Sequence, residues 1–333
     1  MDLGSANVRL VDGGGRRLAE ASVLAVRRAD PKRVVACGDE ARRMEGRAPT
    51  GLELVHPIHR GAIADYDAAE ALLRRLLTAL GAGRSRFRRA RPVLVAARWQ
   101  QSQVDERAIE QALANAGAGQ VHFLAAPLLA AAGLGLEVRA PRGRLIVDIG
   151  AEESSAAVVT AGGIARAGRW AVGGAAMDEA LVRWFRQQHG LVIGRPTAEG
   201  LKKAAAAPGA APAGEQVSVA GVRLGDGLPA VVTVPAAELT EPLLPVLDEL
   251  AENVARLLGE TPPELLADVW EDGGHLVGGV ALMRGLADHM GRRMQLRMLP
   301  AENAPEAVAD GLQAVLRGSW PAQGSGSVAY RTA

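Results

Sequence analysis

The feature that most constrains the fold of this chain is a pattern that occurs once in each half: an apolar run, an aspartate turn, a second run, a glycine turn and a third run. In the first half, the aspartate turn is DLGS (2–5), the glycine turn is DGGG (12–15) and the third run is residues 22–26. In the second half, the corresponding parts are DIGA (148–151), AGG (161–163) and WAV (170–172). Short alternating runs joined by glycine turns are typical of antiparallel hairpins. We therefore predict a duplicated α/β protein whose two similar halves face each other across a cleft.

Helical patterns separate the two copies. Asp67 is predicted to cap a helix, with Glu70 completing a capping box and the leucines between residues 72 and 80 forming one apolar stripe. Further helices are predicted at residues 104–115, 178–188 and 243–258. The segment FLAAPLLAAAGLGL at residues 123–136 is only 14 residues long and contains a proline, so we expect a buried helix rather than a membrane span.

The composition excludes several classes of protein. A formal net charge of +1 gives no whole-protein argument for a nucleic acid partner. The single cysteine, Cys37, allows no internal disulfide and fits a reducing cytoplasm. The six histidines show no metal-ligand spacing, and the beginning of the sequence, MDLGSANVRL, does not read as a signal peptide.

Eight sequence blocks resemble the MreB family of bacterial actin-like cell-shape proteins, a branch of the actin, Hsp70 and sugar-kinase superfamily. They are DLGSAN (2–7), GDEARRMEGRAP (38–49), GAIADYDAAEALL (61–73), VLVAA (93–97), VDIG (147–150), TAEGLK (197–202), PPELLADV (262–269) and GGVALMRGL (278–286). Their order and spacing follow the family over residues 1–316. The resemblance implies duplicated actin-like, ribonuclease H-like domains around a central nucleotide cleft.

The resemblance also implies a domain organisation. We expect an actin-like domain at residues 1–140 with a small insertion at 27–60, and a second at residues 141–317 with an insertion at 180–240. Residues 318–333 are predicted to be a disordered tail. In the family several apolar residues precede the first aspartate, whereas here only Met1 does, so we expect the natural chain to start upstream.

The family binds ATP with magnesium, and its residues can be matched one by one. Asp2 and Asp148 are implied as magnesium ligands through water. The implied nucleotide-binding residues are Ser5, Ala6, Asn7, Gly150, Ala151, Glu199, Gly200, Leu201, Lys202, Gly278, Gly279, Val280 and Ala281. Val280 stands where the family has a third glycine, which narrows the space for the nucleotide.

Further departures fall where the chemistry takes place. Ala151, Glu152, Glu153 and Ser154 replace two glycines and two threonines of the second phosphate loop. Ala126, before Pro127, stands at the position of the family's catalytic glutamate, so no catalytic residue is assigned, and Ala175 replaces an aspartate. A carboxylate about 4 Å from a phosphate charge costs on the order of 4 kcal/mol at an effective dielectric constant near 20.

These departures predict an ATP site that is weakened or lost, with at most weak hydrolysis. Glu152 and Glu153 could instead be solvated and harmless, or one of them could ligate magnesium. Two other functions stay open: a fully active ATP-hydrolysing MreB filament, and a small-molecule kinase of the same superfamily. The kinase needs a carboxylate base near the acceptor hydroxyl, and the eight blocks offer none.

The resemblance further implies a scaffold for cell-wall growth at the inner face of the cell membrane. Its expected partners are further copies of itself or another MreB-type protein, and proteins of cell-wall synthesis. Five arginines around Phe87 could bind an anionic membrane surface, or could form only a solvated basic loop. Nucleic acid is not expected as a partner, because this is the single dense basic patch and it holds one aromatic residue.

Overall fold

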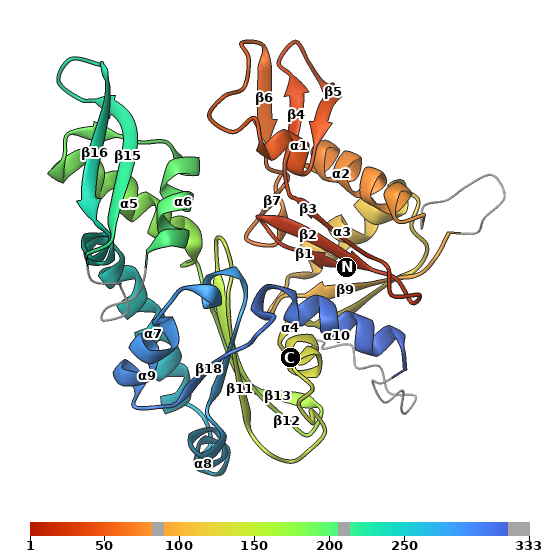
Figure 1. Ribbon diagram of the computed structural model, residues 1–333. Coiled ribbons are helices and arrows are strands. Elements are labelled where there is room, and N and C mark those ends of the chain that lie inside the picture. Colours follow the sequence, from red (N-terminus) through yellow and green to blue (C-terminus); the bar gives the residue numbers. More distant parts are fainter. Residues whose placement is uncertain (82–89, 206–213, 319–333) are drawn as a thin grey trace. The chain divides into compact units, whose positions relative to one another are not determined.

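The chain leaves its first unit at residue 140 and returns to it at residue 306. The computed structural model describes residues 1–81, 90–205 and 214–318 (Figure 1). Unit 1 comprises Met1–Ala140 and the described segment from Glu306 on, and unit 2 comprises Pro141–Pro305. Residues 306–317, which the sequence assigns to the second domain, thus pack with unit 1.

The described part of unit 1 contains three antiparallel sheets and one parallel strand pair. The sheets have the orders β1-β2-β3, β5-β4-β6 and β7-β8, and β9 pairs with β10. Their bounds are β1 Asp2–Leu3, β2 Asn7–Val11, β3 Arg17–Ala21, β4 Leu24–Arg27, β5 Asp30–Cys37, β6 Leu52–Val55, β7 Ile58–His59, β8 Ala62–Ile63, β9 Val93–Ala97 and β10 Val121–Ala125. The helices are α1 Asp39–Arg42, α2 Tyr66–Ala79, α3 Gln103–Asn115, α4 Ala126–Gly133 and α10 Ala307–Leu316.

The leucine stripe of α2 forms much of the core of unit 1. Leu72 and Leu76 are at most 2% exposed and pack in one cluster with residues of β2, β9 and α3. The helix is capped by Asp65, whose carboxylate accepts a hydrogen bond from the Ala68 amide at 3.0 Å. The predicted cap at Asp67 is therefore wrong by two residues, because both aspartates precede the stripe and the spacing alone does not separate them.

Helices α4 and α10 of unit 1 cross at two glycines. A Cβ placed on Gly133 would lie 1.9 Å from the Ala307 carbonyl oxygen, and one placed on Gly311 would lie 1.9 Å from the Leu129 carbonyl oxygen. The two helix backbones can approach this closely only because neither glycine has a side chain. This contact explains why the end of the described chain belongs to unit 1.

Unit 2 is built on a mixed sheet of order β13-β12-β11-β17-β18 and a smaller antiparallel sheet of order β14-β15-β16. The strands are β11 Arg144–Ile149, β12 Ser154–Thr160, β13 Gly163–Trp170, β14 Leu191–Val192, β15 Gln216–Arg223, β16 Pro229–Pro235, β17 Gly274–Val277 and β18 Met298–Pro300. The helices are α5 Gly174–Gln188, α6 Arg195–Ala204, α7 Leu244–Gly259, α8 Pro263–Asp272 and α9 Leu286–Met294, with 3-10 turns η1 Ala236–Leu243, η2 Gly279–Leu282 and η3 Ala304–Glu306. Strands β11 and β17 run parallel, so the loops after them leave the same edge of the sheet.

The predicted repeat is present as two antiparallel three-stranded units, β1-β2-β3 and β13-β12-β11. The third strand of each copy, however, begins earlier than predicted. In the second copy Thr160 pairs with Gly163, and Ala161 and Gly162 have φ values of 48° and 76°. A two-residue turn with positive φ at both positions leads directly into the next strand, so β13 starts at Gly163 rather than at residue 170.

The predicted helices at 104–115, 178–188 and 243–258 are confirmed as α3, α5 and α7. The segment 123–136 differs from its prediction: residues 123–125 complete β10, and α4 begins at Ala126 with Pro127 in its first turn. Proline favours that position because its missing amide has no partner there in any case. No helix among the described residues is long and apolar enough to span a membrane.

Candidate functional site

The first phosphate loop predicted from the sequence is the turn between β1 and β2 of unit 1. The Gly4 amide donates to the Asn7 carbonyl oxygen at 3.1 Å, and a Cβ on Gly4 would lie 2.7 Å from that oxygen. Ser5 Oγ accepts from the Gly61 amide at 3.4 Å, and Asn7 Oδ1 accepts from Arg42 at 3.1 Å. The backbone of Ala6 accepts from the Ser22 amide, so the turn is fixed at both ends.

Asp2 lies next to a cation that the sequence analysis did not identify. Asp2 and Arg9 are direct partners in the β1–β2 ladder, and Arg9 Nη1 lies 3.6 Å from Asp2 Oδ2. Arg9 Nε also donates to Glu306 Oε1 at 2.8 Å. Burial raises the pKa of the Asp2 carboxyl, and the charge of Arg9 opposes that rise. Arg9 thus links a carboxylate of its own hairpin and one 297 residues later in the sequence into one charged cluster in unit 1.

The predicted second phosphate loop, residues 150–153 of unit 2, closes on itself and on the start of α5. The Gly150 amide donates to the Glu153 carbonyl oxygen at 3.0 Å. The carbonyl oxygens of Gly150 and Ala151 accept from the amides of Gly174 and Ala175 at 3.0 and 2.6 Å. These amides belong to the first turn of α5, which has no side-chain cap. The loop backbone therefore caps the helix in this structure.

The two substituted polar residues at the end of this loop are engaged with β13 and the segment after it. A Glu153 carboxylate oxygen lies 3.6 Å from Arg169 Nη1 of β13, which is close enough for an ion pair. Ser154 Oγ donates to the Val172 carbonyl oxygen at 2.6 Å and is almost fully buried. Ser154 thus serves the packing of β12, and the charge of Glu153 is partly balanced by Arg169.

Asp148 and Gly278 meet at the edge of the sheet where β11 and β17 end. Asp148 pairs with Val277, and a Cβ placed on Gly278 would lie 2.3 Å from Asp148 Oδ1. Gly278 has a φ of 87°, which few residues other than glycine adopt. Gly279 has open space around its Cβ position. Glycine is thus required at residue 278 but not at residue 279.

Two further predicted residues of this segment are buried. Val280 is 8% exposed and Ala281 is 3% exposed, and both belong to the core of unit 2. The Cγ2 of Val280 lies near the start of α5, 3.2 Å from where a Cβ on Gly174 would be. The branched side chain of Val280 therefore packs inside unit 2.

The residues predicted to bind the nucleoside lie on α6, and they differ in burial and in their polar partners. Lys202 Nζ lies 2.8 and 2.9 Å from the two carboxylate oxygens of Asp178 and donates to the Gly174 carbonyl oxygen at 3.0 Å. Glu199 forms an exposed ion pair with Lys203 at 2.7 Å. Leu201 is buried in the core, and Gly200 has open space around it.

Asp178 of α5, which is only 8% exposed, was not identified from the sequence. Burial raises the pKa of its carboxyl, and the hydrogen bond from Lys202 opposes the rise. The signal that could have identified it is a carboxylate beside Met177 and Leu181 on the apolar face of an amphipathic helix. The pair fixes the Lys202 ammonium over the first turn of α5.

Ala126, which the resemblance places at the position of the family's catalytic glutamate, is the first residue of α4. The preceding N-cap residue is Ala125, which provides no side-chain hydrogen bond. Neither residue has a group that can accept a proton from water. Phe87 and four of its five neighbouring arginines, Arg84, Arg86, Arg88 and Arg89, lie outside the described residues.

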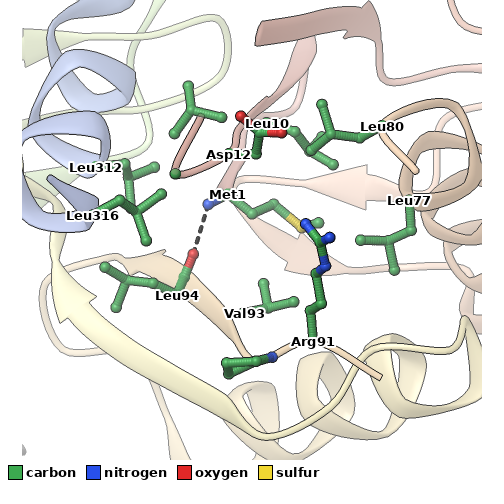
Figure 2. A pocket seen from close by; sticks show the side chains of 13 residues that line it. Met1, Leu10, Asp12, Leu77, Leu80, Arg91, Val93, Leu94, Leu312 and Leu316 are labelled. Atoms are coloured by element: carbon green, nitrogen blue, oxygen red, sulfur yellow. Dashed lines mark hydrogen bonds between the residues drawn. The ribbon is translucent and has the colours of Figure 1, made fainter. Parts of the chain in front are cut away.

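Unit 1 also contains a cavity of about 120 Å³ that the sequence analysis did not predict. Figure 2 shows it surrounded by Leu10, Leu77, Leu80 and Leu312, with Asp12 and Arg91 as its charged residues. The amino group of Met1 donates to the Leu94 carbonyl oxygen at 2.6 Å beside it. Its mainly apolar lining does not have the converging donors that phosphate binding needs.

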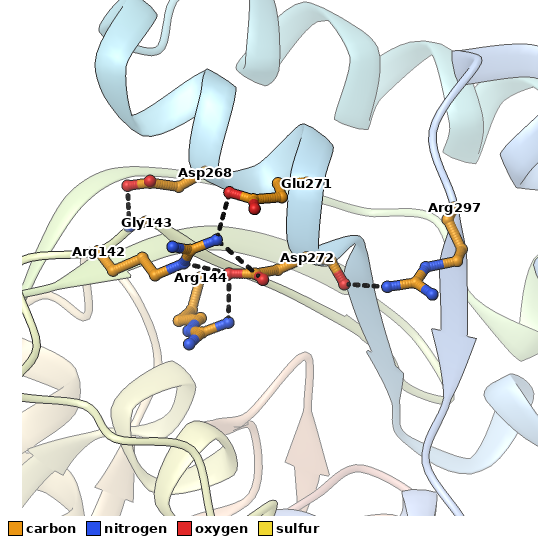
Figure 3. A network of polar contacts seen from close by, with 7 residues as sticks. All are labelled: Arg142, Gly143, Arg144, Asp268, Glu271, Asp272 and Arg297. Carbon is orange, nitrogen blue, oxygen red and sulfur yellow. Dashed lines mark hydrogen bonds and ion pairs between the residues drawn. The ribbon is translucent and has the colours of Figure 1, made fainter.

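A charged network in unit 2 joins the start of β11 to the end of α8 (Figure 3). Arg142 and Arg144 both contact the Asp272 carboxylate, and Arg142 also contacts Glu271 at 2.6 Å. Arg297 donates to the Asp272 carbonyl oxygen at 3.0 Å. The hydrogen bond from Arg142 holds the pKa of Asp272 below its usual value. This network ties α8 to the sheet.

Comparisons with known proteins agree over nearly the whole chain. A family model described as MreB/Mbl protein matches residues 1–320. The cell shape-determining protein Mbl of Bacillus subtilis (strain 168) is 33% identical over 317 residues, which cover 95% of this chain and 94% of that protein. The crystal structure of MreB5 of Spiroplasma citri bound to ADP has a TM-score of 0.89 and 26% identity, with 96% of each chain covered. A MamK double helical filament shares the fold, with a TM-score of 0.76 and 17% identity over 94% of this chain and 96% of that one.

Proposed function

This chain belongs to the MreB/Mbl family of cell shape-determining proteins, and we propose that it is a cytoskeletal scaffold whose nucleotide site is weakened at its phosphate end. The family match confirms the resemblance drawn from the eight sequence blocks. The fold is the actin-like fold of the structural neighbours. Because the MreB5 neighbour was solved with ADP, nucleotide is the ligand class to test on this chain.

Several retained features support a nucleotide site. Gly4 and Gly278 stand where a Cβ would collide with neighbouring atoms, so both turns keep the shape that glycine allows. Lys202 is held in place by Asp178 and by the Gly174 carbonyl oxygen. A lysine ammonium fixed beside a helix start is a group that can bind an anionic or polar ligand.

The observation that best supports a weakened site is that loop 150–153 is hydrogen-bonded to the first turn of α5. Helix starts bind phosphate through free backbone amides, but the Gly174 and Ala175 amides of α5 already donate to Gly150 and Ala151. Opening the loop would break those two hydrogen bonds. The two carboxylates in the loop would then oppose a triphosphate, at a cost on the order of 4 kcal/mol for one at about 4 Å. We infer that ATP binds weakly here.

Hydrolysis should be weaker still. Ala126 offers no carboxylate at the start of α4, and a missing general base removes about two to four powers of ten of rate. The protein is then at most a slow ATPase, and assembly does not depend on rapid turnover.

The proposed assembly and location of the protein are supported by its family membership. We propose that it associates with further copies of itself or with another MreB-type protein, as the MamK filament illustrates for the fold. We place it at the inner face of the cell membrane, in contact with cell-wall synthesis proteins and bound to the membrane through the residues around Phe87. Sedimentation with anionic vesicles, comparing wild type with Phe87→Ser, tests the membrane contact.

Calorimetric titration with ATP tests the weakened site. Wild type should bind ATP weakly, and Glu152→Gly with Glu153→Thr should raise the affinity about tenfold or more, since about 1.4 kcal/mol corresponds to a factor of ten. Adding Ala126→Glu should raise hydrolysis without a further change in affinity.

The matched control is Glu179→Thr, which removes a carboxylate of the same unit from an exposed pair with Arg183 on α5. It should leave ATP affinity unchanged. Micromolar binding by wild type with magnesium-dependent phosphate release would instead show an active ATPase. An unchanged affinity in the loop double variant would show that the glutamates do not limit the site.

A further inference from the structure

The cluster of Asp2, Arg9 and Glu306 bears directly on the metal of the nucleotide site. The family resemblance assigns Asp2 to a magnesium-bound water. In the structure, Asp2 Oδ2 lies 3.6 Å from Arg9 Nη1, and Arg9 Nε lies 2.8 Å from Glu306 Oε1. The Arg9 side chain is only 16% exposed, so its charge is little screened by water.

The position of Arg9 follows from the backbone. The β1–β2 turn brings residue 9 directly opposite residue 2 in the antiparallel ladder, on the same face of the hairpin. Glu306 precedes the first residue of α10 and holds the other side of the guanidinium. An arginine held on two sides by carboxylates has few alternative positions.

These residues do not fit a magnesium ion beside Asp2. Magnesium requires oxygen ligands at about 2.0–2.1 Å in near-octahedral geometry and keeps several of its waters. The Arg9 guanidinium stays charged at every physiological pH, and it lies beside the Asp2 carboxylate that would orient those waters. A divalent cation there would have to displace Arg9 from both of its partners.

We propose that Arg9 is the built-in cation of the unit 1 phosphate loop and takes the place beside Asp2 that the family gives to magnesium. This inference rests on the proposed function, because the family assigns Asp2 to the nucleotide site. Its consequence is that nucleotide binding to this chain depends little on magnesium at Asp2. Replacing Arg9 by an apolar residue then leaves Asp2 and Glu306 as two carboxylates without their shared cation, which is an arrangement that attracts a divalent metal.

The test measures ATP affinity by calorimetry, once with magnesium in large excess over ATP and once with EDTA. For wild type and for Arg9→Lys the two affinities should agree within about threefold. For Arg9→Met, magnesium should improve the affinity about tenfold or more, a gain of about 1.4 kcal/mol. A wild-type ratio of tenfold or more, or an Arg9→Met ratio equal to that of wild type, would overturn the proposal.

A purely structural role for Arg9, tying β2 to the start of α10, is tested by Glu306→Gln. This variant replaces the ion pair to α10 by at most a neutral hydrogen bond and leaves the Arg9–Asp2 pair. Its magnesium ratio should stay at the wild-type value. A ratio that rises as far as in Arg9→Met would mean that the tie, rather than the charge beside Asp2, controls metal dependence, and the proposal would fail.

A second measurement does not need nucleotide. Binding of Mn²⁺ alone, followed by electron paramagnetic resonance, should be at least about tenfold tighter in Arg9→Met than in wild type, and Asp2→Asn added to Arg9→Met should abolish the gain. If Arg9→Met gains no such Mn²⁺ binding, the inference about Arg9 is wrong. If Mn²⁺ behaves as expected but no variant binds ATP, the proposed nucleotide site fails while the assignment of the cation stands.

Discussion

At the scale of single residues, the candidate site of unit 2 contains a position where a side chain would not fit. Gly278 shows this most clearly, because its Cβ position lies 2.3 Å from Asp148 Oδ1 and 2.5 Å from the Ile149 carbonyl oxygen. Its φ of 87° adds a backbone conformation that side chains disfavour. Its neighbour Gly279 has neither restriction. The two adjacent glycines therefore form a natural pair for an experiment.

Gly278→Ala should destabilise unit 2, whereas Gly279→Ala should not. The backbone strain alone costs about 1–3 kcal/mol, and the contact with Asp148 and Ile149 adds to it. At Gly279 we expect a change within about 0.5 kcal/mol, as for substitutions that meet no neighbour. Urea unfolding followed by tryptophan fluorescence measures both, since Trp170 and Trp184 lie in unit 2. Equal midpoints for the two variants would contradict the geometry of the turn.

At the scale of helices and strands, local patterns predicted most of the fold. The leucine stripe of α2 and the glycine turns of both hairpins depend on neighbours within a few residues, so their elements could be predicted. The cap at Asp65 and the division of residues 123–136 between β10 and α4 could not be predicted, because the local sequence fits two interpretations equally well at each place. Tertiary packing decides between the two interpretations, and a short stretch of sequence carries no information about that packing.

The candidate site was predicted only as far as family motifs reach. The motifs supplied Asp2, Lys202 and the glycines, each by its position in the sequence. Their partners Arg9 and Asp178 were missed, because a pairing across a hairpin or between two helices depends on register and crossing geometry. The charge environment of a predicted site is thus the part that needs a structure.

Strand β17 carries a titratable group whose behaviour can be predicted with its sign. Burial lowers the pKa of His275 below 6.5, and the nearby charge of Arg144 lowers it further (Figure 3 shows Arg144 in its network). Between that lowered pKa and about 6.5, the unfolded chain binds more protons at this residue than the folded one. The stability contributed by neutral His275 is therefore complete above about pH 6.5 and is lost as the pH falls through this interval.

We expect His275→Gln to flatten the loss of stability as the pH falls below about 6.5, because its side chain does not titrate. Thermal unfolding at half-unit pH steps measures the effect. His122→Gln, which removes an exposed histidine of β10, is the control and should keep the wild-type slope. The prediction fails if both variants show the same pH dependence as wild type.

At the scale of the whole molecule, the chain path makes unit 1 depend on its two ends. The chain builds β1 to α4, passes into unit 2 at residue 141, and returns at residue 306 to place α10 on α4. Three contacts support the return: Arg17 with Asp310, Gln313 with the Asp12 carbonyl oxygen at 3.0 Å, and Arg9 with Glu306. Unit 1 therefore cannot complete its packing until unit 2 has been synthesised.

Gly311→Ala tests this dependence, because its methyl group would meet the Leu129 carbonyl oxygen 1.9 Å away and push α10 from α4. Hydrogen exchange should show faster exchange in unit 1, in α4 and β1 to β3, while β11 to β13 of unit 2 keep their protection, since units with separate cores open separately. The matched control is Gly200→Ala in α6, where the Cβ position is open and alanine should stabilise the helix by about 0.5–1 kcal/mol. Faster exchange in both units would show instead that they unfold as one cooperative body, and unchanged exchange would show that α4 and α10 tolerate a wider separation than their glycines imply.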